Sequence, residues 1–287
     1  MNSNKEINPI VTIGVPVFNG EKFLKKRLDT IISQTFSDFK VFISDNGSTD
    51  NTEKICRDYS GKDSRIEYFR QDKNTGGVNN FWFLLDEAKT KYFVWAAVDD
   101  WWLPQFLEKN VKVLESNSRF VGSISKIEYY DMNRIKTKFS KIKKYYSYDE
   151  YPKSPDFENR VKFYLRLNRA ENIYSIFQTD VIKKFRKIKV CAGLDLAVIL
   201  DVLKYGEISV IDEVLMYRSA KGISGIPNKK NFTMYNEYGF LGKIFPFLPF
   251  SIWIAKNLGL KVFIQNLDYL LFINLSATKY QLKHGLK

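Results

Sequence analysis

The stretch IVTIGVPVFNGEKFLKKRLDTIISQTFSDFKVFISDN, residues 10–46, holds two short β-type runs on either side of one helical pattern. The outer runs, residues 10–18 and 39–46, are rich in Val, Ile and Phe and are short enough for strands. The apolar residues between them lie at helical spacing: Phe23, Leu24, Leu28, Ile31 and Ile32. The stretch therefore predicts a strand, a helix over residues 21–34 and a second strand.

The same alternation continues to residue 116. Two more β-type runs and three more helical patterns follow, at residues 65–71 and 91–98, and at 48–60, 78–89 and 104–116. Alternating strands and helices imply right-handed crossovers and a mostly parallel sheet with flanking helices. We therefore expect an α/β fold, in which ligands bind outside the carboxyl ends of the strands.

Polar residues follow three of the four expected strands, in the sequences PVFNG, SDNGSTD and VDDWW. These strand ends should meet in one crevice that carries carboxylates and amides. Asp99 and Asp100 end the apolar run KYFVWAAV, and bare carboxylates are costly to bury. Carboxylate oxygens suit Mg²⁺ or Mn²⁺, so we expect a divalent cation that holds a nucleotide diphosphate there. Alternatively, one of the two acids caps the helix that begins near Pro104.

Length and composition are those of a globular protein with a substantial core. The chain has 287 residues, of which 45% are hydrophobic and 27% charged. Cys56 and Cys191 form neither a disulfide framework nor a metal-binding spacing, which indicates reduced thiols. The N-terminal sequence MNSNKEINP lacks the apolar stretch of a signal peptide, so we expect a cytoplasmic chain.

The net charge of +13 lies entirely in the second half of the chain. Residues 1–120 hold 17 basic and 17 acidic residues, which leaves 45 − 17 = 28 basic and 32 − 17 = 15 acidic residues for 121–287. Two basic clusters occur at 134–144 and 183–189. This asymmetry indicates an anionic partner, which is a nucleic acid, a phosphate-bearing substrate or an anionic membrane surface. The alternative is a basic face that is merely solvated.

From residue 226 onward the sequence becomes apolar and aromatic, interrupted by Lys243, Lys256 and Lys261. No uninterrupted apolar stretch reaches the roughly 20 residues that span a bilayer. We expect a C-terminal helical extension over residues 226–287. Its helices either lie in a membrane interface or pack on the protein's own domain.

The motifs of residues 10–115 resemble family 2 glycosyltransferases of the GT-A fold. The likeness is carried by the opening stretch together with GSTDNT, by KNTGGVNNFW and by the acidic strand end. It continues more loosely through GLDLAVILDVLKYG and VLMYRSAKGIS. The resemblance implies a Rossmann-like sheet in residues 1–225, with a nucleotide-binding half (10–115) and an acceptor half (116–225). It also implies inverting transfer of a sugar from a nucleotide donor.

Matched position by position, the family's nucleotide-binding residues correspond to Pro16, Phe18, Asn19, Asp45, Asn46, Ser48, Asn74, Gly77 and Asn79. The resemblance implies that Asp45 accepts a hydrogen bond from the base. Taken without the resemblance, Asp45 is equally a turn residue, and Gly47 and Ser48 are a turn and a helix cap.

The acidic strand end departs from the family pattern. The family usually carries Asp-x-Asp-Asp, whereas this sequence has AVDD at 97–100. Asp99 matches the metal-binding position, so the resemblance implies Mg²⁺ or Mn²⁺ there, with Asp100 beside it. Ala97 stands where the family commonly has an acid near the ribose, which points to altered donor affinity or donor type.

A second departure lies in YRSAKGIS, residues 217–224, where related chains often carry a metal-contacting histidine and this one has none. Arg218 or Lys221 would offset diphosphate charge instead. After the acids come Trp101 and Trp102, which would stack on an acceptor sugar or pack in the core.

An inverting transfer needs a base that takes the proton of the acceptor hydroxyl. The resemblance places this base late in the domain, at the start of a helix, where the sequence has Asp195 in AGLDLAVIL. The alternative for Asp195 is an N-cap of that helix.

The sequence thus predicts a metal-dependent glycosyltransferase that builds a surface polysaccharide, glycolipid or glycoprotein glycan. A UDP-sugar is the default donor, and the acceptor is a glycan or a lipid-linked molecule at the inner face of the cell membrane. Ala97 and the missing histidine leave a catalytically silent nucleotide-sugar-binding protein as the alternative. The zero charge balance of the first half argues against a nucleic-acid partner.

Overall fold

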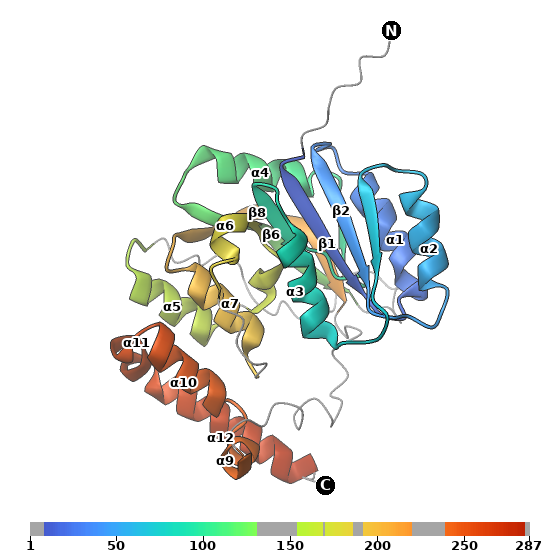
Figure 1. The fold of residues 1–287 in the computed structure, drawn as a ribbon. Helices are drawn as coiled ribbons and strands as arrows, with labels where there is room; N and C mark the ends of the chain where they lie inside the picture. The colour runs from blue at the N-terminus through green and yellow to red at the C-terminus, as the bar shows by residue number, and fades with distance from the viewer. Residues whose placement is uncertain (1–8, 131–153, 169, 186–191, 220–238, 285–287) are drawn as a thin grey trace. The chain divides into compact units, whose positions relative to one another are not determined.

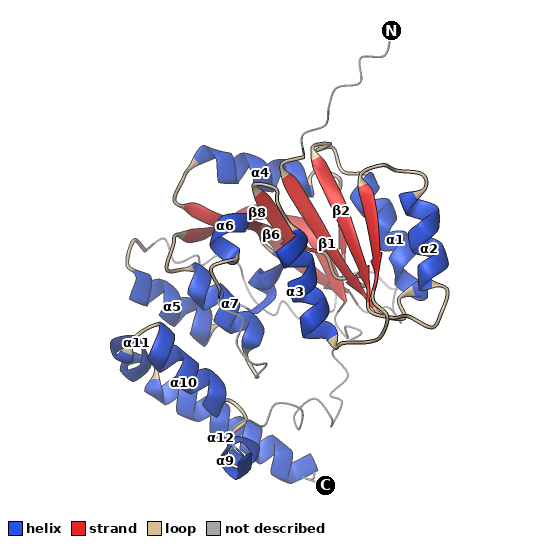
Figure 2. Ribbon diagram, in the orientation of Figure 1, coloured by secondary structure: helices blue, strands red, loops and turns tan. Residues whose placement is uncertain are grey.

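The computed structural model describes residues 9–130, 154–168, 170–185, 192–219 and 239–284. They belong to two compact units, whose elements are drawn in Figures 1 and 2. The first unit comprises Met1–Tyr151, Tyr174–Lys184 and Glu207–Gly225, and the second comprises Pro152–Ile173, Phe185–Gly206 and Ile226–Lys287. The second unit therefore takes in two segments of the predicted acceptor half besides the residues after 225.

The first unit is built on an eight-stranded sheet with the order β3-β2-β1-β4-β7-β6-β8-β5. The first four strands in sequence are β1 (Val11–Val17), β2 (Phe39–Asp45), β3 (Ile66–Arg70) and β4 (Tyr92–Trp95). All of their pairings, β1 with β2, β1 with β4 and β2 with β3, are parallel. They are connected through α1 (Glu21–Ile32), α2 (Thr52–Ser60) and α3 (Gly77–Glu87). This half confirms the predicted alternation of strands and helices.

The rest of the sheet is mixed. It consists of β5 (Trp101–Trp102), β6 (Phe120–Tyr130), β7 (Ile176–Gln178) and β8 (Glu207–Ser219), with helices α4 (Phe106–Ser116) and α6 (Thr179–Ile182). β6 and β8 are parallel, whereas β7 is antiparallel to β4 and β6, and β5 is antiparallel to β8. Four of the seven pairings are thus parallel, and the sheet is mixed because β5 and β7 add antiparallel pairings.

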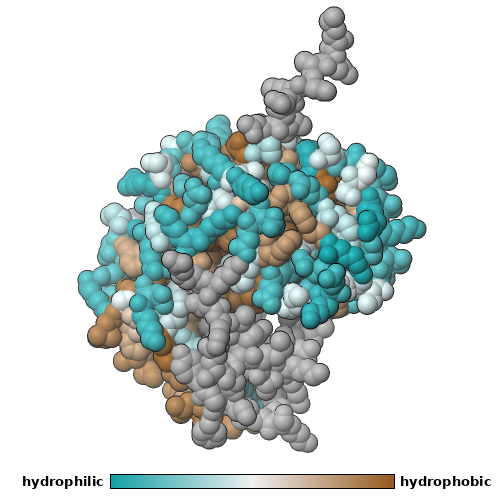
Figure 3. All heavy atoms as spheres, viewed as in Figure 1, coloured by the Kyte–Doolittle hydropathy of each residue, from teal (hydrophilic) through white to brown (hydrophobic). Residues whose placement is uncertain are grey.

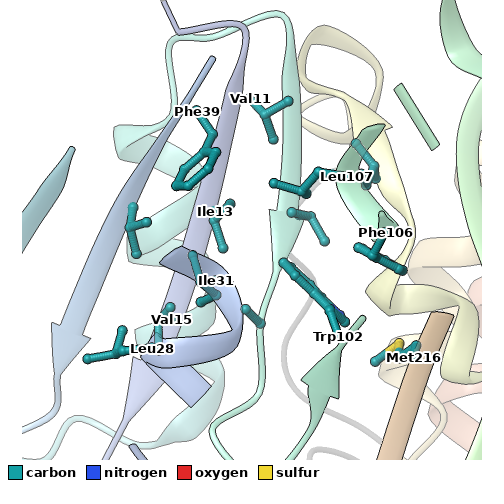
Figure 4. Close-up of a cluster of buried hydrophobic side chains, with 14 of the residues drawn as sticks. Val11, Ile13, Val15, Leu28, Ile31, Phe39, Trp102, Phe106, Leu107 and Met216 are labelled. Atoms are coloured by element: carbon teal, nitrogen blue, oxygen red, sulfur yellow. The ribbon is translucent and has the colours of Figure 1, made fainter. Parts of the chain in front are cut away.

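One buried apolar cluster of the first unit lies on the face of the sheet that α1 covers. Every residue of β1 is buried, as expected for a strand covered by helices on both faces. Its odd-numbered side chains, Val11, Ile13 and Val15, meet Leu28 and Ile31 of α1 in the cluster of Figure 4. The same cluster continues through Trp102, Phe106, Leu107 and Met216. Because side chains alternate along a strand, the opposite face is left for α3.

Helix α3 is held on that opposite face by polar contacts at the end of β2. The Asn80 side chain donates to the backbone oxygen of Ser44 at 2.9 Å, and the Ser44 hydroxyl donates to Asn80 Oδ1 at 2.5 Å. Both side chains are buried. Helices α1 and α3 thus cover opposite faces of the sheet. The polar loops lie at its remaining edge, at the carboxyl ends of β1 to β4.

The second unit is helical. It contains α5 (Phe157–Arg166), most of the 3-10 turn η2 (Ala170–Tyr174), α7 (Leu194–Val202) and the C-terminal helices α9 (Gly239–Ile244), α10 (Leu248–Asn257), α11 (Leu260–Gln265) and α12 (Leu267–His284). α5 and α7 pack on each other and on the C-terminal helices. The C-terminal region is thus helical, as the sequence predicts.

The junction of α7 and α10 is tight. Gly193 precedes α7 with φ of +88°, a conformation that side chains disfavour, and a Cβ there would lie 3.1 Å from the Phe250 ring. Phe250 and Trp253 of α10 are buried, with their rings nearly parallel. Within the described residues, none of the helices is both long and apolar enough to cross a bilayer.

Candidate active site

The loops after β1 and β2 are tied together at the carboxyl edge of the sheet. The backbone N–H of Asn46 donates to the Val17 oxygen at 2.8 Å, and the backbone N–H of Asn19 donates to the Ser48 hydroxyl at 2.8 Å. The Asn19 side chain accepts in turn from the backbone N–H of Thr49 at 2.8 Å. Asn19 adopts a φ of +50°, which asparagine tolerates better than most residues. Three predicted nucleotide-binding residues, Asn19, Asn46 and Ser48, are therefore neighbours.

The loop after β3 joins this assembly through Asn46. The Asn46 amide donates to Asn74 Oδ1 at 2.9 Å, and Asn46 Oδ1 accepts from the backbone N–H of Thr75 at 2.9 Å. The Asn79 amide donates to the Thr75 oxygen at 2.7 Å, which fixes the same loop to the first turn of α3. Gly77 begins that helix. The structure thus brings Asn74, Gly77 and Asn79 to the edge where the sequence places them.

The Asp45 carboxylate lies beneath these loops and is fully buried. It accepts hydrogen bonds from the Ser48 backbone N–H at 2.8 Å, the Tyr68 hydroxyl at 2.9 Å and Arg70 Nη1 at 2.8 Å. Burial and the bond to Asp45 raise the pKa of the Tyr68 hydroxyl, so it stays a donor at neutral pH. Asp45 therefore satisfies its charge within the protein and holds β2, β3 and the GSTD turn together.

The turn that follows Asp45 requires glycine. Gly47 has a φ of +75°, and a Cβ on it would lie 3.0 Å from the backbone carbon of Lys73. Helix α2 is preceded by Asn51 as its N-cap position, so Ser48 does not cap it. Ser48 instead joins the two loops through Asn19.

The two apolar candidates of the first strand differ in exposure. Pro16 is buried within β1, opposite Ser44 of β2, and contributes to the floor of the edge. Phe18 is 42% exposed directly after the strand, which is unusual for so large an apolar side chain at the end of a buried strand. Its ring is the aromatic surface that this edge offers to a ligand.

The acidic strand end is balanced by arginines. Asp100 is 2% exposed; Arg218 Nε donates to its Oδ2 at 2.9 Å, and the Ser219 backbone N–H donates to Oδ1 at 3.3 Å. Burial raises the pKa of Asp100, and Arg218 opposes that shift. Burial alone would lower the pKa of Arg218, but the Asp100 carboxylate and nearby tyrosines outweigh it and raise the pKa. The predicted metal ligand Asp100 and the predicted diphosphate residue Arg218 thus form a buried ion pair.

A second arginine lies below the same acid. Arg27 of α1 is 1% exposed, and its Nη1 donates to the Asp100 backbone oxygen at 3.3 Å. Among the described residues, its Nε and Nη2 have no hydrogen-bond partner. Burial lowers the pKa of Arg27 to about 10, although the carboxylates of Asp99 and Asp100 counteract this. Its guanidinium carbon lies 3.9 Å from the centre of the Trp102 ring. The arginine therefore remains charged at neutral pH beneath the acidic pair.

The two tryptophans are both engaged by protein groups. Trp102 is 2% exposed and stacks on Phe106 with a ring-centre distance of 4.4 Å, so it belongs to the core and cannot stack on an acceptor sugar. Trp101 is half-buried; the Tyr130 ring lies 3.9 Å from its centre and the Lys26 ammonium 3.4 Å. The Tyr130 ring and the Lys26 ammonium are both too close to share one face of the Trp101 ring, so they lie on opposite faces. A sugar would have to displace Lys26 to stack on Trp101.

The acidic end does not form an all-protein metal site. The described residues contain no cluster of three or more His, Cys, Asp or Glu side chains with metal-binding geometry. Helix α4 has Gln105 at its N-cap position, so the capping alternative for Asp99 and Asp100 is wrong. Asp100 is paired with Arg218, and Asp99 is the residue that the sequence predicts as the metal ligand. Magnesium commonly binds through one or two carboxylates together with substrate phosphates, and such a site suits this donor set.

The candidate base, Asp195, lies in the first turn of α7 and is exposed. The N-cap of α7 is Gly193, so the capping alternative for Asp195 is wrong. Asp195 belongs to the second unit, whereas Asp99 belongs to the first. The candidate Lys221 lies outside the described residues, as does most of the two basic clusters.

Residues 12–185 match the family model named glycosyl transferase family 2. The chain belongs to glycosyl transferase family 2. This membership confirms the resemblance found in the sequence and the transferase class.

Two curated relatives illustrate the similarity. An uncharacterized glycosyltransferase of Methanocaldococcus jannaschii is 29% identical over 175 residues, covering 58% of this chain and 60% of the relative. Glycosyltransferase GlyA of Streptococcus pneumoniae is 30% identical over 136 residues, covering 45% of this chain and 18% of the relative. The family 2 chain thus spans less than two thirds of either relative.

Solved structures share the fold. Residues 1–349 of Staphylococcus aureus TarS in complex with UDP align with a TM-score of 0.57 at 18% identity, covering 73% of this chain and 60% of that one. The mannosyltransferase PcManGT of Pyrobaculum calidifontis in complex with GDP-Man and Mn²⁺ aligns with a TM-score of 0.52 at 15% identity, covering 88% and 62%. These likenesses confirm the predicted α/β fold of the GT-A type for the family 2 chain.

Three site residues were missed by sequence reasoning, and two of them left a signal in the sequence. Arg70 ends the third expected strand, and the strand-end rule applied to that strand would have included it. Arg27 lies three residues after Leu24 and four before Ile31, on the apolar face of its helix, so its burial follows from the helical period. Tyr68 gave no such signal, because its partner Asp45 comes from the neighbouring strand.

Proposed function

We propose that this family 2 chain transfers a sugar from a nucleotide-diphosphate donor to a hydroxyl acceptor with inversion at the anomeric carbon. One observation carries the proposal. Side chains that the family resemblance assigns to nucleotide binding, from the loops after β1, β2 and β3, are joined by hydrogen bonds at one edge: Asn19 with Ser48, and Asn46 with Asn74. Structural neighbours that carry UDP, UDP-GlcNAc or GDP-Man support the donor class. A UDP-sugar remains the default donor.

The donor's base would lie against Phe18, whose exposed ring offers a stacking surface. Backbone and amide groups of the Asn46–Asn74 assembly would face the nucleoside. Because Asp45 is already bonded to Tyr68 and Arg70, its role in this proposal is to fix the loop and leave direct contact to its neighbours. Ala97 removes one acid from the edge, which lowers the negative charge that the donor diphosphate meets.

A divalent cation, Mg²⁺ or Mn²⁺, would be held by Asp99 together with the donor's phosphate oxygens. When bound, such an ion supplies positive charge that stabilises a departing diphosphate. Arg218 and Arg27 add two more positive charges near the same strand end, against the charges of Asp99 and Asp100. In this proposal the arginines offset negative charge at the strand end, where related chains often have a histidine.

Asp195 would serve as the base. Its carboxylate takes the proton of the acceptor hydroxyl while the acceptor oxygen forms a bond to the anomeric carbon. The bond from that carbon to the diphosphate oxygen breaks at the same time, and its electron pair leaves with the diphosphate. Attack from the side opposite the leaving group inverts the anomeric configuration.

The acceptor proposed is a glycan or a lipid-linked molecule, presented at the inner face of the cell membrane in the synthesis of a surface glycan or glycolipid. The basic second half and the apolar C-terminal helices support a peripheral membrane location. A catalytically silent nucleotide-sugar-binding protein of the same fold is the second candidate. Ala97 and the absence of histidine from residues 217–224 favour it.

A donor screen followed by one substitution separates the two candidates. Thermal unfolding with UDP- and GDP-sugars, with and without Mn²⁺, identifies the donor as the one that raises Tm. Release of nucleoside diphosphate from that donor is then measured for the wild type and for Asp195→Asn. We expect the variant to keep the donor-induced rise in Tm and to lose more than about 100-fold in release rate.

Asp58→Asn is the matched control, because Asp58 is also an exposed helical aspartate, on α2 of the first unit. The control should release nucleotide at the wild-type rate. A wild type that binds the donor but releases no nucleotide with any acceptor extract would instead establish the silent binder. Equal rates in wild type and Asp195→Asn would remove Asp195 from the role of base.

A further inference from the structure

The inward side of helix α12 mixes polar and apolar side chains. Leu270 and Asn274 are buried, and Tyr269, Ile273, Ala277, Thr278 and Gln281 are partly buried. The Asn274 amide donates to the Leu270 oxygen at 2.8 Å, and its Oδ1 accepts from the backbone N–H of Phe247 at 3.1 Å. The Thr278 hydroxyl donates to the backbone oxygens of Asn274 and Ile244. Two of these bonds, to Phe247 and Ile244, tie the helix to the segment around the start of α10.

The outward side is rich in large apolar residues. Seven of them, 39–70% exposed, run from α11 into α12: Leu260, Ile264, Leu267, Leu271, Phe272, Leu275 and Leu282. We call these seven residues the outer apolar face. Eight of the twelve exposed large apolar side chains of the described chain lie between residues 260 and 282, so the concentration is local. Brown surface gathers over the C-terminal helices at the lower left of Figure 3.

Exposed apolar surface of this extent marks a binding surface, because water is an unfavourable neighbour for leucine and phenylalanine side chains. Charge identifies the neighbour. Residues 239–284 contain five lysines and a single acidic residue, Asp268. Arg166 of α5 pairs with Asp268 at 2.7 Å and neutralises it. Lys256, Lys279 and Lys283 are exposed on the same helices. The surroundings of the outer apolar face are thus strongly basic.

We infer that the outer apolar face docks on an anionic lipid bilayer, with α12 lying in the plane of the interface. Exposed apolar side chains beside exposed lysines suit binding in a membrane interface, and no described helix can span the bilayer. A second copy of this chain fits less well, since it would bring two faces of the same strong positive charge together. Anionic headgroups instead attract each of the exposed lysines. The inference is independent of the proposed sugar transfer and is tested without donor or acceptor.

The test uses the full chain and sedimentation with vesicles. Neutral vesicles contain phosphatidylcholine alone. Anionic vesicles contain phosphatidylcholine with roughly 30% phosphatidylglycerol, which imitates an anionic membrane leaflet. We expect binding to the anionic vesicles, at least about tenfold weaker binding to neutral ones, and weaker binding at 0.5 M salt, roughly as electrostatic screening requires. The double variant Leu271→Gln/Leu275→Gln should bind anionic vesicles at least about tenfold more weakly, since each leucine loses apolar burial. Leu103→Gln, an exposed leucine of the first unit, is the control and should bind like the wild type.

A second readout tests the inference even if the Leu271→Gln/Leu275→Gln variant does not fold. Phe272→Trp keeps an aromatic residue at an exposed position, and its added fluorescence should shift to the blue on anionic vesicles and be quenched by bromine-labelled acyl chains. Failure of the wild type to bind anionic vesicles at low salt would overturn the inference. So would an unquenched tryptophan at 272, or a Leu271→Gln/Leu275→Gln variant that binds vesicles normally but turns a dimer into a monomer.

Discussion

Arg218 Nε and Asp100 Oδ2 lie 2.9 Å apart, with the carboxylate buried and the arginine side chain only 21% exposed. The pair joins the end of β8 to the residues after β4, across 118 positions of sequence. Because of this pair, the adjacent acids Asp99 and Asp100 have different roles, and we refer to this as the division between them. Asp100 is bound to Arg218 within the protein, and we propose the adjacent Asp99 for the metal.

Asp99→Ala tests this division. We expect the variant to keep the wild-type unfolding temperature without ligand, since Asp99 is not part of the buried ion pair. It should lose the additional rise in Tm that Mn²⁺ gives in the presence of the donor, because the remaining carboxylate is held by Arg218. Differential scanning fluorimetry measures both. An equal Mn²⁺-dependent rise in the variant would contradict the assignment of the metal to Asp99.

Removing one partner of the Asp100–Arg218 pair should destabilise the protein strongly. Arg218→Gln leaves a buried, uncompensated carboxylate, which costs about 3–5 kcal/mol in the free energy of unfolding. The double variant Asp100→Asn/Arg218→Gln should cost clearly less than the sum of the single variants, because no lone charge remains. Urea unfolding of the four proteins gives the coupling. Strict additivity would show that the two side chains do not interact in solution.

Gly47→Ala should destabilise the protein by about 1–3 kcal/mol, since alanine disfavours a φ of +75° and its Cβ meets the Lys73 backbone. The loop after β2 would also shift, so donor binding should weaken. Gly77→Ala is the control for stability: a Cβ at that helix start meets no atom within 4 Å, and alanine favours helix. We expect it to unfold at or slightly above the wild-type urea concentration. Similar losses in both variants would refute the strained turn at Gly47.

Stability should fall at low pH in part through Asp63. Two hydrogen bonds from the Arg65 side chain, at 3.0 and 2.7 Å, lower the pKa of Asp63. Because its unfolded pKa is about 3.9, this contribution is present above roughly pH 4 and is lost as the pH falls through the lower folded-state pKa. Asp63→Asn should cost up to about 1 kcal/mol at pH 7. The difference in free energy of unfolding between Asp63→Asn and the wild type should disappear at low pH, near pH 2, in urea unfolding. A difference that stays constant with pH would disprove the linkage.

The parallel half of the sheet was predictable because its signals are local. β1 and β2 begin and end within about a residue of their apolar runs, and Leu24, Leu28 and Ile31 mark the buried face of α1. The strand-end rule then located Asn19, Asp45 and Asp99 at one edge without any structural information.

The antiparallel pairings were not predictable, because they depend on partners far away in sequence. β5 has only two residues, Trp101 and Trp102, and becomes a strand through pairing with Tyr217 and Met216. The same return of β8 brings Arg218 to Asp100, so an arginine predicted for a diphosphate has a protein partner instead. In Trp102 the sequence could not distinguish a stacking platform from a core residue, since both use the same aromatic surface.

Hydrogen bonds join Asn19 with Ser48, and Asn46 with Asn74 and Thr75. Such loops are preorganised, so a ligand that lands on them has little chain entropy to remove. Affinity at this edge should then depend on shape and charge, and association should proceed without a slow ordering step.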